Sequence, residues 1–166
     1  MTWNLTTPLI GAQAIGEKST TQKHNLGQIV QATDGTSVNE FIYLKGVAST
    51  VVGDWVGYSP AVGTSVRAVA DGNYPLAVAM TTNTTTTSYA WYCISGNIPA
   101  NGLTSVTHTS GFLALTSTAG KLDDGSVIGD HVFNARKTTA VHVVGTFLDT
   151  YSIARPFSTN VVTVRN

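Results

Sequence analysis

Two stretches of the chain, 40–58 and 88–96, are dense in aromatic and β-branched residues punctuated by Gly or Asp. Side chains alternate between the two faces of a strand, so Phe41 and Tyr43 would face one way and Ile42 the other. Neither stretch alternates between apolar and polar residues, which indicates that both faces are buried. We therefore expect central strands of a barrel or sandwich, or strands whose outer face meets another subunit.

The second stretch shows the same two-sided pattern. Ala90, Tyr92 and Ile94 fall on one face of the expected strand, whereas Trp91 and Cys93 fall on the other. The pattern predicts architecture, and neither stretch contains a catalytic constellation.

Turn-forming residues divide the rest of the chain into short segments. Residues 96–102, with Pro99 between two glycines, are predicted to form a loop, and the threonine-rich run 81–87 a solvated one. Residues 135–139 are the best local candidate for a helix, and a poor one. Further strands are expected at 25–32, 54–58, 66–70, 75–80, 103–108, 111–117 and 140–148.

About nine or ten short strands without a convincing helix indicate an all-β fold. We predict a single-domain antiparallel β-barrel or β-sandwich with an extended N-terminal arm, and we divide the chain into the arm, 1–24, and the β domain, 25–166. Apolar residues in 1–24 show no clear period, so this segment is either a partly ordered tail or an arm across a neighbouring subunit. Residues 151–166 end in VVTVR, which suits a last strand or a second arm.

The composition excludes some partners. Charged residues make up 11% of the chain and the formal net charge is +0, so we expect no nucleic-acid binding, which needs an excess of Lys and Arg. We also expect no signal peptide and no membrane span, because no apolar run approaches about 18 residues. Cys93 is the only cysteine, which rules out an internal disulfide and favours a reducing compartment.

Candidate catalytic and metal-binding residues do not form a recognisable motif. Asp123, Asp124 and Asp130 surround glycines, a pattern more typical of turns than of a calcium loop. There is no GxSxG elbow. The histidines lie at no metal-ligand spacing, and they are His24, His108, His131 and His142. We predict no catalytic residue, no cofactor and no metal ion, and hence no enzyme.

Aromatic side chains offer three interpretations. We rank a role in the core first, a role in subunit contacts second and a sugar-stacking platform third, because aromatic residues are common anchors of cores and interfaces. The residues concerned are Trp3, Trp55, Trp91, Tyr58, Tyr89 and Tyr92.

Residues 40–80, EFIYLKGVASTVVGDWVGYSPAVGTSVRAVADGNYPLAVAM, followed by YAWYCISG at 89–96, resemble decoration or cement proteins of tailed bacteriophages. The shared theme is a GEFIYLKGVA-like strand pair, an apolar run and a YAWYxISG strand, over about half the chain. The resemblance implies a β protein without enzymatic activity that is made in the host cytoplasm. It would sit on the capsid exterior as a homotrimer or other symmetric cluster and bridge major capsid protein subunits.

The resemblance also implies which residues contact a partner. Apolar residues near the two ends would bury surface against neighbouring subunits, and many symmetric copies would multiply a modest contact. These candidate partner-binding residues are Trp3, Leu5, Leu9, Ile10, Val161 and Val162.

Three alternatives stay open. A phage tail or fibre component that binds a host surface would usually show repeats or a coiled coil, and the sequence shows neither. A carbohydrate-binding β module would need exposed coplanar aromatic rings. A hydrolase would need a cleft that holds His108 or His142 beside an Asp and a Ser.

Overall fold

The computed structural model describes residues 2–9, 11–103, 113–124, 130–138 and 148–158. Across these ranges the regular structure is entirely β, and no helix is long and apolar enough to cross a membrane. The strands are β1 (Asn4–Leu5), β2 (Lys18–Ser19), β3 (Ile29–Thr33), β4 (Val38–Lys45), β5 (Trp55–Tyr58), β6 (Ser65–Arg67), β7 (Tyr74–Ala79), β8 (Tyr89–Asn101), β9 (Leu113–Leu115), β10 (Leu122–Asp124), β11 (His131–Lys137) and β12 (Leu148–Ser158).

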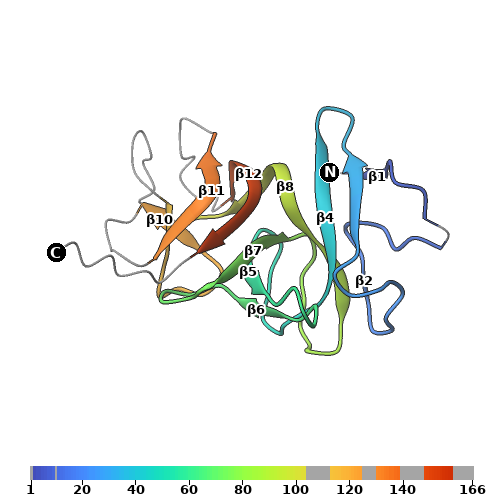
Figure 1. Cartoon of the computed structure of the whole chain (residues 1–166), viewed down its shortest axis with the longest axis horizontal. Coiled ribbons are helices and arrows are strands. Elements are labelled where there is room, and N and C mark those ends of the chain that lie inside the picture. Colours follow the sequence, from blue (N-terminus) through green and yellow to red (C-terminus); the bar gives the residue numbers. More distant parts are fainter. Residues whose placement is uncertain (1, 10, 104–112, 125–129, 139–147, 159–166) are drawn as a thin grey trace.

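All twelve strands belong to one antiparallel sheet with the order β1-β3-β4-β8-β7-β12-β11-β9-β10. Strand β2 pairs with β8, and β5 lies between β6 and β7. Figure 1 places β1 and β2 toward one end of the long axis and β10 and β11 toward the other. The prediction of a single-domain antiparallel all-β fold is confirmed. Of the two predicted architectures, the described strands do not form a closed barrel, because β1 and β10 end their order without pairing with each other, and the fold is compatible with a sandwich-like domain.

Both faces of β4 and β8 are buried, as the sequence pattern predicts. Phe41, Tyr43 and Trp91 belong to the main core, which extends to β12, whereas Ile42 and Tyr92 face a second core on the other side of the sheet. The chain itself covers both faces. The second core consists of Ile42, Leu44, Val56, Ala77, Ala79, Ala90, Tyr92 and Ile94.

The predicted loop at 96–102 is wrong, because β8 continues through Asn101. Its first half pairs with β4 and β7, and its second half pairs with β12. Gly96 lies between the two halves with a φ of 118°, and a Cβ there would lie 2.1 Å from the Asn39 carboxamide oxygen. Pro99 is tolerated because its half of β8 pairs with β12 alone among the described strands, so one side of the backbone needs no donor.

The helix candidate at 135–139 is also wrong. Residues 135–137 belong to β11, which pairs with β9 and β12. Tertiary pairing outweighs the weak local preference, since helical stability in proteins comes mostly from packing. The predicted strand 140–148 lies outside the described residues except for Leu148, the first residue of β12, and 103–108 lies outside them except for Leu103.

Candidate functional site

The N-terminal segment extends the sheet at the edge of β3. Asn4 and Leu5 pair with Thr33 and Ala32. The backbone amides that follow, at residues 6 and 7, donate to the carbonyl oxygen of Gln31 at 2.9 and 3.3 Å. These bonds cover backbone groups that an open strand edge would expose.

Gln13 fixes the next part of this segment to the domain. Its side chain is 2% exposed, and its Oε1 accepts a hydrogen bond from the Tyr43 hydroxyl at 2.9 Å. Its Nε2 donates to the carbonyl oxygens of Glu17 at 2.7 Å and Tyr89 at 3.1 Å. The indole Nε1 of Trp91 donates to the Gln13 carbonyl oxygen at 2.9 Å. One amide side chain thus connects the N-terminal segment with β4 and β8.

His24 completes this contact. Its Nε2 accepts a hydrogen bond from the backbone N–H of Gln13 at 3.1 Å, so the ring is neutral there. Its ring centroid lies 5.1 Å from that of Tyr43 and 5.2 Å from that of Trp91. Burial, and then the charge of Lys23, lower the pKa of His24 below its usual value.

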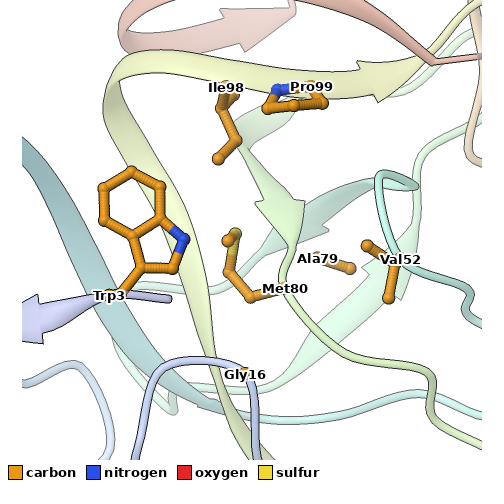
Figure 2. A pocket seen from close by; sticks show the side chains of 7 residues that line it. All are labelled: Trp3, Gly16, Val52, Ala79, Met80, Ile98 and Pro99. Carbon is orange, nitrogen blue, oxygen red and sulfur yellow. The ribbon is translucent and has the colours of Figure 1, made fainter. Parts of the chain in front are cut away.

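An apolar pocket of about 290 Å³ opens where this segment meets the sheet. Figure 2 shows the Trp3 indole on one side and Met80, Ile98 and Pro99 across from it. The indole also packs edge-on against Phe41, with ring centroids 5.0 Å apart and an interplanar angle of 70°. The pocket is lined by Trp3, Gly16, Val52, Ala79, Met80, Ile98 and Pro99.

The side chains that line this pocket suit binding and not proton transfer. None of its lining side chains is ionisable, so none can transfer a proton. The one polar side-chain group in the lining is the indole N–H of Trp3, which is a donor only. The pocket therefore suits an apolar side chain or ligand.

A buried carboxylate holds the wall formed by Val52. Asp54 is 1% exposed, and its Oδ2 lies 3.1 Å from Arg67 Nη2 and accepts a hydrogen bond from the Val51 backbone at 3.1 Å. Its Oδ1 accepts from Asn101 Nδ2 at 2.8 Å, and the same amide donates to the Val52 carbonyl oxygen at 3.3 Å. The loop before β5 is thereby tied to β6 and β8.

Cys93 and Asp130 are two further side chains that could carry chemistry, and both are buried. Burial raises the pKa of Cys93 to about 12, so its thiol stays protonated near neutral pH and is a poor nucleophile. Asp130 accepts a hydrogen bond from the backbone N–H of Asp71 at 2.6 Å. Within the described residues no three His, Cys, Asp or Glu side chains gather as a metal site, and residues 125–129 of the Asp-rich loop lie outside them.

The structure describes three of the six predicted partner-binding residues. Trp3, Leu5 and Leu9 are partly buried against the main core of their own chain. Ile10, Val161 and Val162 lie outside the described residues. A contact of these six residues with another subunit stays a prediction.

Of the residues that line the pocket, the sequence predicted only Trp3 as a partner-binding residue. Val52, Met80 and Pro99 come from three segments far apart in the chain, and Pro99 was assigned to a loop. No local pattern signals such a gathering. The apolar pair Val51-Val52 next to the turn-forming Gly53-Asp54 was the available sequence signal, and in the structure each valine is 47% exposed.

Comparison with protein-family models, with curated proteins and with solved structures found no significant match for this chain.

Proposed function

We propose that this chain is a structural virion protein that binds the outer surface of a phage capsid and stabilises it by bridging major capsid protein subunits. The resemblance of residues 40–80 and 89–96 to decoration proteins supports this proposal. In that role the protein is a homotrimer or other symmetric cluster, takes no cofactor and catalyses no reaction.

The observation that carries the proposal is the apolar pocket beside Trp3. An apolar side chain from a capsid subunit would fill it, and burial of one such side chain contributes about 1.5–3 kcal/mol. Val52 lines the pocket and is 47% exposed, so apolar surface continues from the pocket to the exterior of the molecule. A stable interface needs roughly 800 Å² per partner, so the pocket would anchor a wider contact that many symmetric copies reinforce.

Co-sedimentation with empty phage heads assembled without this protein tests the proposal. Wild-type protein should co-sediment at a fixed copy number per head. Val52→Lys places a charge at the pocket rim and should weaken binding at least tenfold. Val38→Lys is a matched control, because Val38 is also exposed, at 59%, and does not line the pocket, so binding should be unchanged. Failure of the wild-type protein to bind heads would contradict the proposal.

A truncation tests the N-terminal segment separately. Removing residues 1–9 deletes Trp3 and β1 but keeps Gln13 and the buried Ile15, which is 1% exposed. The truncated protein should fold and lose head binding. Removing 1–15 would be a poorer test, because it also removes part of the main core.

A further inference from the structure

Two exposed phenylalanines stack on each other at the end of the sheet opposite β1. Phe133 of β11 and Phe157 of β12 are direct cross-strand partners, with ring centroids 5.2 Å apart and planes 18° from parallel. They are 41% and 38% exposed. A paired, rigid aromatic surface of this kind is a typical anchor of a protein interface.

A bulge in the β11–β12 ladder adjoins the aromatic pair. The register passes from Phe133↔Phe157 to Ala135↔Ile153, so one residue of β11 faces three of β12. Asn134 of β11 has a φ of 58°, and Arg155, in the β12 part of the bulge, has a φ of 51°. Such left-handed residues other than glycine cost about 1 kcal/mol or more each, and they gather where a side chain must be aimed.

The bulge changes which side chains face outward. Val132 and Ala135 both contact the main core although they are three residues apart, where a regular strand would place them on opposite faces. Phe133 is exposed because it follows the buried Val132 in regular alternation, and the bulge after it leaves Arg136 exposed as well. The same distortion brings an arginine onto the outer side of the strand that carries the phenylalanine.

The aromatic pair continues into a hollow. Pro75 of β7 is the cross-strand neighbour of Phe157, and it lines a depression of about 350 Å³ together with Tyr58 and Val66. Arg155 is close enough to Tyr58 for its charge to lower the pKa of that hydroxyl, against a larger rise caused by burial. The two phenylalanines and the hollow thus share one region of the surface, and Arg155 lies near it.

We propose that the Phe patch, defined as Phe133, Phe157, Arg136 and the hollow beside Pro75, docks a second capsid subunit that presents an apolar side chain next to a carboxylate. This inference rests on the proposed function and deepens it, because a protein that bridges subunits needs two contact surfaces. Figure 1 places β11 and β12 toward the end of the molecule opposite β1, so the Phe patch and the N-terminal segment would contact different capsid subunits.

Charge complementarity selects this partner. Strand β11 presents Arg136 on its outer side and contains no carboxylate. The charge of Arg155 is already matched by Glu40, whose Oε2 lies 3.2 Å from its Nη2. The patch is therefore locally positive and apolar, and the matching surface is acidic and apolar.

Single-stranded nucleic acid fits the patch less well. The two rings stack on each other, which uses ring faces that bases would need. Phosphate tracking also requires several cations in a row, and the chain has a formal net charge of +0.

Binding to empty heads and the thermal disassembly of the heads test this inference together. Phe133→Ser/Phe157→Ser and, separately, Arg136→Glu should each lower occupancy at least tenfold and remove the stabilisation of the heads. Val38→Ser is the matched control, because it removes an apolar side chain of β4 that is 59% exposed and lies outside the patch, and it should behave as wild type. The double variant is first checked for a wild-type circular dichroism spectrum, and if it is misfolded, Arg136→Glu decides the matter.

The outcomes separate the two proposals. If the wild-type protein does not bind heads, the proposed function fails. If it binds and the patch variants bind and stabilise equally well, only this inference is overturned. Binding of the wild-type protein to oligo(dT) that the patch variants lose would overturn it in favour of a nucleic-acid surface.

Discussion

Gln13 and Asp54 are buried polar side chains that each join segments distant in sequence, but one is a neutral amide and the other a carboxylate. Gln13 joins residues 11–24 to β4 and β8. Asp54 joins the loop before β5 to β6 and β8. Neither side chain lines the apolar pocket, but each holds a segment that does, because Gly16 belongs to residues 11–24 and Val52 to the loop before β5.

The difference between them lies in what remains after each is removed. Loss of the amide leaves neutral groups that water can reach once the N-terminal segment moves away. Loss of the carboxylate leaves the charge of Arg67 and the amide of Asn101 without their partner inside the fold. We therefore expect the first loss to have a local effect and the second a global one.

Replacement of Asp54 gives the largest expected effect. Asp54→Ala should lower the free energy of unfolding by about 3 kcal/mol, at the lower end of the range for broken buried ion pairs, because the Arg67 side chain is 30% exposed and can be partly rehydrated. Urea unfolding measures this value. A change below about 1 kcal/mol would show that the carboxylate is not a structural centre.

Replacement of Gln13 should have a smaller and more local effect. Gln13→Ala removes hydrogen bonds to Tyr43, Glu17 and Tyr89 and should cost about 1–3 kcal/mol. Amide hydrogen exchange should increase in residues 11–24 and stay slow in β4 and β8. An equal increase in all three regions would show that this contact does not act locally.

Acidification should loosen the same contact through His24. Its pKa in the folded protein lies below 6.5, so the unfolded chain takes up the proton first, and stability falls as the pH drops from about 6.5 toward the folded value. Protonation also removes the acceptor for the Gln13 backbone N–H. Urea midpoints at pH 7.5 and pH 5.5 test this, and His24→Asn should show a smaller difference than wild type; equal differences would refute the assignment.

The exposed ion pair between Glu40 and Arg155 should have the smallest effect on stability. Glu40→Gln should change the free energy of unfolding by less than about 1 kcal/mol, because Arg155 is 61% exposed and solvent screens the pair. The same urea titration measures it. A cost comparable to that of Asp54→Ala would mean that burial is not what separates these carboxylates.

The sequence by itself determined the two-faced strands at the centre of the sheet. In β4 the alternation of Phe41 and Tyr43 with Ile42 and Leu44 is a property of the extended backbone, and apolar residues on both sides demand two cores. The same reasoning predicted the strands at 54–58 and 75–80, close to the observed β5 and β7. It could not give the strand order.

Tertiary structure alone decided where the proposed binding surfaces lie. Pro99 continues a strand because its half of β8 pairs with β12, and Arg136 shares the outer side of β11 with Phe133 because a bulge between them resets the alternation. The pocket gathers Trp3, Met80 and Val52 from separate segments. These features depend on long-range pairing between strands, whose energy no local window of sequence contains, whereas alternation depends on backbone geometry that every strand shares.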